Sequence, residues 1–138
     1  MRLSVSGLVT TAALITNLAT SGRAADVSDA HKALYLQYCA SCHGPNGKGD
    51  GTLSRILWTK PADLTQIAKK NGGQFPFQKV VEFIDGTNPV RAHGAPDMPV
   101  WGEIFRHEAT TASEKEKQAR AQGKAMFITE YLRSIQDK

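Results

Sequence analysis

The stretch YCASCHG, Tyr38–Gly44, contains both cysteines of the 138-residue chain and places a histidine directly after the second one. Two cysteines in one short turn can form a disulfide, contribute to a zinc site, act as a redox dithiol or anchor a cofactor covalently. Each of these uses makes a different demand on the surrounding residues. The rest of the sequence therefore indicates which of these uses applies.

Three of the four uses fit the sequence poorly. A disulfide between Cys39 and Cys42 would close a very small loop and remove little entropy from the unfolded chain. A structural zinc ion needs four ligands, and the sequence has no second cysteine pair and no paired histidines. A thioredoxin-like dithiol begins a helix that follows a strand, whereas this pair follows a predicted helix.

The fourth use is the C-x-x-C-H pattern of haem c attachment. In that pattern both thiols form thioethers with the haem vinyl groups, and the imidazole of the next residue binds the iron. The pattern explains why His43 follows Cys42 at once and why the chain has no further cysteine. We therefore predict one haem c attached through Cys39 and Cys42, with His43 as an iron ligand.

A second iron ligand is expected from the segment GAPDMPVWG, residues 94–102. Pro99 restricts Met98 to extended conformations, so this short arc is stiff enough to present the methionine sulfur. Met126 belongs to a predicted helix and is expected to pack in the core, whereas His93 is the alternative ligand because imidazole also binds haem iron. Ligation by His43 and Met98 would leave no open position on the iron and favour electron passage over substrate chemistry.

The first 25 residues have the three parts of a secretory signal peptide. Arg2 supplies the positive charge, residues 8–18 form a short apolar run, and residues 22–25 form a cleavage site rich in small residues. We expect cleavage to leave residues 26–138 as a single exported, periplasmic domain without a membrane span, since the apolar run is too short to cross a bilayer. Cleavage reduces the 17 basic residues to 15 against 13 acids. Because these charges are scattered, nucleic-acid binding has little support.

The apolar periodicity predicts an all-α domain with long glycine-rich loops. A helix is expected over 27–38, capped by Asp26 or Ser28. Two others are expected over 63–73, with Asp63 as the cap, and over 77–85, ended by Gly86, and a loop follows over 86–102. Thr111 and Glu114 fit a capping box for the last helix. That helix carries an apolar stripe consisting of Met126, Phe127, Ile128, Tyr131, Leu132 and Ile135.

The quoted stretch continues as YCASCHGPNGKGDG, and PADLT, NGGQFP, IDG, AHGAPDMPVWGEIF and EYLRSI follow in that order. Together these segments resemble the bacterial class I c-type cytochromes over nearly all of the mature chain. The resemblance implies the cytochrome c fold, in which the first and last helices cross beside the haem and the Met98 loop faces it opposite His43.

The resemblance also implies particular contacts for this chain. The face of Ala30, Leu34 and Tyr38 would pack against Gly123, Phe127 and Tyr131. The Pro61 carbonyl would accept a hydrogen bond from the His43 ring, as partners of metal-bound histidines do. The side chains expected to line the haem or pair with its propionates are Trp58, Arg91 and Trp101.

These inferences predict a monomeric electron carrier rather than an enzyme. Its partners would be other redox proteins, with a periplasmic dehydrogenase as donor and a terminal oxidase or reductase as acceptor. Two alternatives use the same haem. One is a subunit held inside a larger dehydrogenase or oxidase complex, and the other is a ligand sensor, which would need an open iron site.

Overall fold

The computed structural model describes residues 23–87, 98–110 and 112–137, and these residues form helices joined by loops, with no strand among them. The prediction of an all-α fold is therefore confirmed. The helices are α1 (Arg23–Tyr38), α2 (Ala40–His43), the 3₁₀ helix η1 (Leu64–Gln66), α3 (Ile67–Lys70), α4 (Phe77–Asp85), α5 (Trp101–His107) and α6 (Glu114–Ser134).

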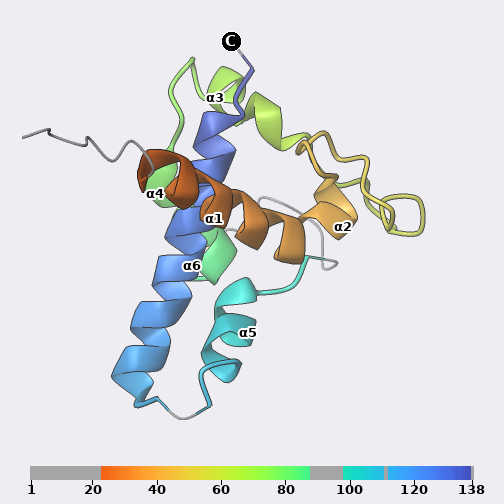
Figure 1. Ribbon diagram of the computed structural model, residues 1–138. Coiled ribbons are helices and arrows are strands. Elements are labelled where there is room, and N and C mark those ends of the chain that lie inside the picture. The colour runs from red at the N-terminus through yellow and green to blue at the C-terminus, as the bar shows by residue number, and fades with distance from the viewer. Residues whose placement is uncertain (1–22, 88–97, 111, 138) are drawn as a thin grey trace, which may run out of the picture.

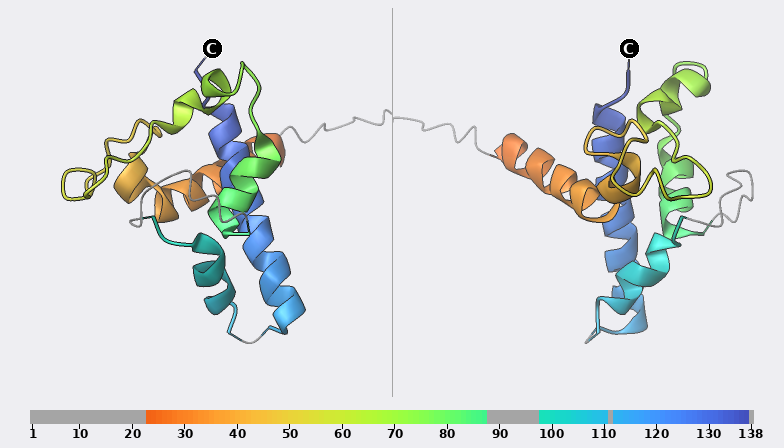
Figure 2. Two further views of the ribbon diagram at one scale, coloured as in Figure 1. Left: turned by 180° about the vertical axis from the view of Figure 1, so that it is seen from behind. Right: turned by 90° about the vertical axis from the view of Figure 1, so that its right-hand side faces the viewer.

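The long helix α6 is the centre of the molecule, and α1, α4 and α5 all pack on it (Figures 1 and 2). α1 crosses α6 as predicted, but the predicted contact face is wrong in part, since Ala30 is exposed and the Tyr38 ring contacts Trp101 and Phe105 of α5. At the crossing, the Tyr35 ring lies 4.8 Å from the Tyr131 ring, and the His31 ring stacks on Phe127 at 4.7 Å. The buried core consists of Tyr35, Cys39, Val81, Ile84, Phe105, Ala121, Ala125, Ile128 and Leu132.

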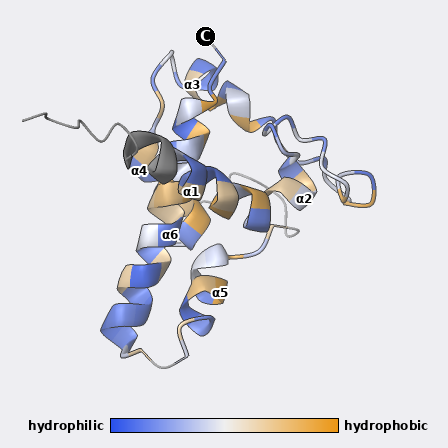
Figure 3. Ribbon diagram, viewed as in Figure 1, coloured by the Kyte–Doolittle hydropathy of each residue, from blue (hydrophilic) through white to orange (hydrophobic). Residues whose placement is uncertain are grey.

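The buried face of α6 differs from the predicted apolar stripe. Met126 and Phe127 are each 48% exposed, so the prediction that Met126 packs in the core is wrong. The helix instead buries Ala121 and Ala125, together with Ile128 and Leu132. Small alanine side chains allow neighbouring helices to approach closely, but they contribute little to an apolar pattern. The first turns of α6 are hydrophilic, as Figure 3 shows.

The ends of the helices follow capping chemistry. Asp63 accepts from the Thr65 amide and starts η1, and Gly86 ends α4 in the left-handed conformation, both as predicted. The capping box of α6 lies two residues later than predicted, since Ser113 and Glu116 form it.

Two further differences concern α1 and α5. α1 begins at Arg23, so neither predicted cap starts it; the alanines at 24 and 25 favour helix and nothing there interrupts it. α5 begins in the last two residues of the stretch predicted as loop and continues to His107, where no helix was predicted, and it buries Gly102 and Phe105. In the part of the chain that the structure describes, no helix has the length and apolarity needed to cross a membrane.

Candidate functional site

The two cysteines and His43 lie where α1 passes into the single turn of α2. Cys39 stands between the two helices, and its amide still donates to the Tyr35 carbonyl at 2.9 Å. The His43 amide in turn donates to the Cys39 carbonyl at 2.9 Å. Cys39 is buried and Cys42 is half-buried, and both are free thiols. The C-x-x-C-H motif is thus one compact turn built on the end of a core helix.

The glycine-rich loop after His43 folds back over the end of α2. Its backbone amides donate to the carbonyls of that turn, which would otherwise be unpaired: Gly49 to His43 (2.8 Å), Gly51 to Cys42 (3.1 Å) and Leu53 to Ser41 (2.9 Å). A Cβ at Gly51 would lie only 2.4 Å from the Ser41 carbonyl oxygen. The approach therefore requires glycine at this position.

The chain's C-terminus anchors this loop from the other side. The Asp137 carboxylate accepts from Lys48 Nζ at 2.9 Å, and the Asp137 amide donates to the Thr65 carbonyl at 3.0 Å. Thr65 is itself tied to Asp63, the residue that caps η1, through an Oγ1–Oδ1 hydrogen bond of 2.6 Å. The segment that follows the loop is thereby fixed to the end of α6.

The His43 ring has a defined orientation. Its Nδ1 donates to the Ala62 carbonyl oxygen at 3.0 Å. The predicted acceptor was the Pro61 carbonyl, one residue earlier, and that prediction is wrong because Pro61 O points instead toward Gly49, where a Cβ would lie 2.3 Å from it. With the proton held on Nδ1, the lone pair of Nε2 is free for a metal ion.

Burial sets the protonation of these groups. It lowers the pKa of His43 below its ordinary value, with the hydrogen bond to Ala62 acting in the opposite direction. It also raises the pKa of the Cys39 thiol to about 12, helped by the neighbouring Cys42. At neutral pH the turn therefore presents a neutral imidazole and a protonated, uncharged Cys39 thiol.

Met98 is placed by its position in the chain, just before α5. It is half-buried and lies three residues before Trp101, the first residue of α5. The Trp101 ring meets the Tyr38 ring edge-on at 5.5 Å, and Tyr38 directly precedes Cys39. Trp101 therefore attaches the start of α5 to the end of α1 that leads into the cysteine turn. Arg91 and His93 lie outside the described residues.

The Tyr38 side chain is held in place by a polar group and a second ring. Its hydroxyl donates to the Glu108 carboxylate at 2.9 Å and accepts from Lys124 Nζ at 3.1 Å, while Lys124 also pairs with Glu108. Phe105 contacts the Tyr38 ring edge-on at 5.0 Å. This cluster joins α1, α5 and α6 and was not anticipated, because its members are far apart in sequence.

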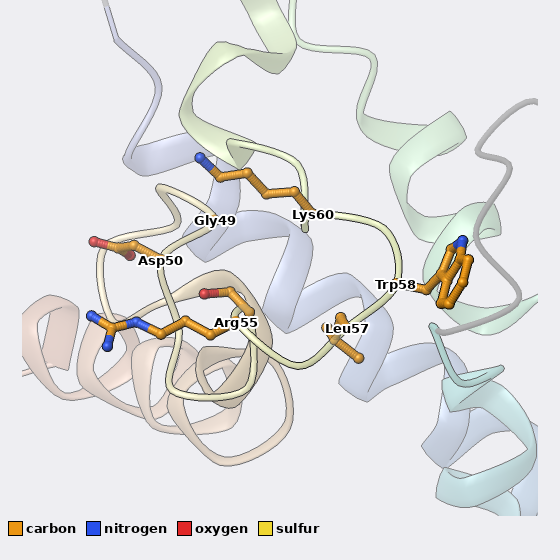
Figure 4. A pocket seen from close by; sticks show the side chains of 7 residues that line it. Gly49, Asp50, Arg55, Leu57, Trp58 and Lys60 are labelled. Atoms are coloured by element: carbon orange, nitrogen blue, oxygen red, sulfur yellow. The ribbon is translucent and has the colours of Figure 1, made fainter.

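The loop after the cysteine turn also lines a pocket of about 440 Å³, shown in Figure 4. Arg55 and Lys60 supply positive charge to its wall, and Leu57 supplies an apolar surface. Trp58 projects away from Arg55 and is 97% exposed. Sequence reasoning selected Trp58 from this loop but missed the two basic residues.

The residues present fit a covalently bound haem. Two free thiols and an imidazole with a free Nε2 share one turn, and the Gly51 backbone lies close against that turn. Cys39 and Cys42 would hold the group, with His43 toward the iron. Among the residues with described positions, no group of three or more histidine, cysteine or acidic side chains converges as a metal site, whereas the zinc alternative requires four ligands.

Comparison with known proteins supports this chemistry. Residues 26–85, somewhat less than half of the chain, match the family described as cytochrome C oxidase, cbb3-type, subunit III. No curated protein and no solved structure matches the chain. The matched segment runs from α1 through the cysteine turn to the end of α4.

Proposed function

We propose that this chain is a c-type cytochrome that transfers electrons through haem c, as the family match over residues 26–85 supports, and that it is an exported monohaem carrier that shuttles single electrons between redox proteins in the periplasm. Residues 1–25 act as the signal peptide, and residues 26–138 form the mature cytochrome c domain. The mature protein is monomeric and keeps no membrane anchor.

The observation that carries this proposal is the hydrogen bond from His43 Nδ1 to the Ala62 carbonyl oxygen. It directs the free Nε2 of His43 away from the backbone, in the same turn that contains Cys39 and Cys42. These two thiols would form the thioether links, and His43 would bind the iron. When bound, haem c supplies an iron that takes up and releases one electron.

Met98 would be the second protein ligand of the iron. Its attachment to the α5 end that contacts Tyr38 supports this role, as does its partial burial. Two protein ligands leave no open position for a substrate or a diatomic gas. The residues of the site therefore hold and shield the group rather than perform chemistry on a substrate.

Electrons pass to and from the protein by transient docking of redox partners. A periplasmic dehydrogenase is the proposed donor and a terminal oxidase or reductase the proposed acceptor. The mature chain has nearly balanced charge, 15 basic residues against 13 acids. Electrostatic steering is therefore mild, and the interfaces are small, as in other short-lived redox encounters.

Spectroscopy of the purified holoprotein tests the ligand assignment. Wild type should show the charge-transfer band of methionine sulfur to ferric iron, and Met98→Ala should lose it and bind carbon monoxide when reduced. His93→Ala should keep the wild-type spectrum. The reverse pattern would assign the ligand to His93, and rapid carbon monoxide binding by wild type would favour the ligand sensor.

A second candidate function is a haem c subunit within a larger respiratory complex. The family description, which names a subunit of a cbb3-type oxidase, favours it. Gel filtration of the native protein separates the two. A free carrier elutes as a monomer, and any association weakens with salt, whereas a subunit co-purifies with a large catalytic chain at all salt concentrations.

A further inference from the structure

Met98 lies between α4 and α5. The backbone at the end of α4 lies close against the backbone at the start of α5. Gly102, the second residue of α5, is buried against the end of α4, and a Cβ built on it would lie 2.1 Å from the Asp85 carbonyl oxygen. A Cβ on Gly86 would lie 2.3 Å from Val100 Cγ1. These two contacts form what we call the glycine stem, consisting of Asp85, Gly86, Val100 and Gly102.

Each glycine of the stem is required for a different reason. Gly86 has a φ of +75°, which side chains disfavour, and Val100 also fills the space beside it. Gly102 lies inside a helix, where alanine is intrinsically favourable. An alanine at 102 is excluded only by the Asp85 backbone. Ordinary contact between a Cβ and another heavy atom begins near 3.4 Å, so the backbones of α4 and α5 would have to separate by about 1 Å.

The stem is rigid because both of its sides are rooted in the core. Ile84 precedes Asp85 and is 4% exposed, and Phe105 lies one helical turn after Gly102 and is 1% exposed. Both belong to the cluster packed on α6. The Asp85 carboxylate also accepts from the Thr87 amide at 2.8 Å, which directs the chain as it leaves α4.

From these contacts we propose that the glycine stem is a positioning element for Met98, and this inference rests on the proposed axial role of that residue. Met98 lies two residues before Val100, and Pro99 between them has a fixed φ. A displacement of the stem should therefore move the methionine sulfur by a similar amount. Gly86 and Gly102 act through Met98 and need not touch the haem themselves.

The test compares Gly102→Ala with Gly123→Ala, in which a second helical glycine has nothing within 4 Å of the new Cβ. Both variants, wild type and Met98→Ala are purified as holoproteins, and mass spectrometry establishes covalent haem in each. The sulfur-to-iron band and the helical circular dichroism are then followed in denaturant, and carbon monoxide binding is measured in the reduced proteins.

We expect Gly102→Ala to retain its haem and helices but to lose most of the band, or to lose the band at a lower denaturant concentration than the helical signal. Its reduced form should bind carbon monoxide. Gly123→Ala should keep the wild-type band and should lose band and helix together, at the same or a higher denaturant concentration, because alanine favours helix. The inference is overturned if Gly102→Ala keeps the full band and loses band and helix together, since a purely structural contact would behave in that way.

Two further outcomes remain decisive. A wild type without the band, or Met98→Ala that keeps it, overturns the axial assignment and this inference with it, whatever Gly102→Ala does. If Gly102→Ala does not accumulate, Gly86→Ala is compared with the double variant Gly86→Ala/Val100→Ala. Recovery of the band in the double variant supports the stem because the Val100 methyl is the obstacle, and a band equally weak in both overturns it.

Discussion

Removing one hydroxyl from the helix crossing should measure how tightly α1 is fixed to the cysteine turn. Tyr35 is fully buried, and its hydroxyl donates to the Gly44 carbonyl at 2.6 Å, directly after His43. Tyr35→Phe deletes this bond and leaves the ring in place. The Gly44 carbonyl keeps one partner, the Gly47 amide at 3.2 Å, so it does not become wholly unsatisfied.

The expected cost follows from that remaining partner. A buried hydrogen bond contributes about 1 kcal/mol, and leaving a buried acceptor unpaired costs about 1–3 kcal/mol. Because Gly44 is still paired, Tyr35→Phe should lower the free energy of unfolding by about 1–1.5 kcal/mol. For a domain of this size that corresponds to a fall in Tm of roughly 4 °C.

The measurement is denaturant unfolding of the holoprotein followed by circular dichroism, with Tyr131→Phe as the matched control. Tyr131 belongs to the same ring pair, but its hydroxyl makes only an exposed bond of 3.4 Å to the Pro45 carbonyl. The control should change the free energy of unfolding by less than about 0.5 kcal/mol. Equal losses in the two variants would refute the account of the crossing.

The same variant has a predicted pH signature. Burial raises the pKa of Tyr35 above its ordinary value of 10.0, so the folded protein holds this proton more tightly than the unfolded chain. The resulting stability is fully present below pH 10 and is lost as the pH rises above it. Tyr35→Phe should therefore lose less stability than wild type between neutral and strongly alkaline pH.

Three further changes test other parts of the structure. Lys124 lowers the pKa of Glu108, so this carboxylate stabilises the fold above its unfolded pKa of 4.5, and acid titration should show Glu108→Gln losing less stability than wild type as the pH falls below that value. Gly49→Ala forces a residue with a φ of +76° to within 2.3 Å of the Pro61 carbonyl oxygen, and it should reduce the yield of haem-containing protein severalfold, measured by haem absorbance. Ser113→Ala removes the α6 cap and should cost about 1 kcal/mol in thermal unfolding.

The helical elements that could be predicted from the sequence are those whose ends are marked by a single capping residue. Asp63 and Gly86 are local signals, because one carboxylate or one left-handed glycine suffices to start or stop a helix. The predicted box of Thr111 and Glu114, in contrast, lies two residues too early, because Ser113 and Glu116 have the same spacing and form the box.

The errors share a physical cause, namely that small residues carry packing information that apolar patterns miss. Ala121 and Ala125 form the close contact surface of α6, while the larger Met126 lies half in solvent. Gly102 made its segment look like a loop, although the absence of a Cβ is what lets α5 meet α4. Which carbonyl accepts the hydrogen bond from His43 depends on the path of a loop. The tertiary contact of Gly49 with Pro61 determines that path.

The central claim is that haem is covalently attached to Cys39 and Cys42, and the intact mass of the protein tests it directly. The exported protein is extracted with acidified acetone, which removes haem that is not covalently bound, and its intact mass is compared with that of a variant carrying Cys39→Ala and Cys42→Ala. The account predicts a mass equal to the mature polypeptide plus one haem for wild type, and the bare polypeptide for the variant. A wild-type mass equal to the bare polypeptide would contradict it.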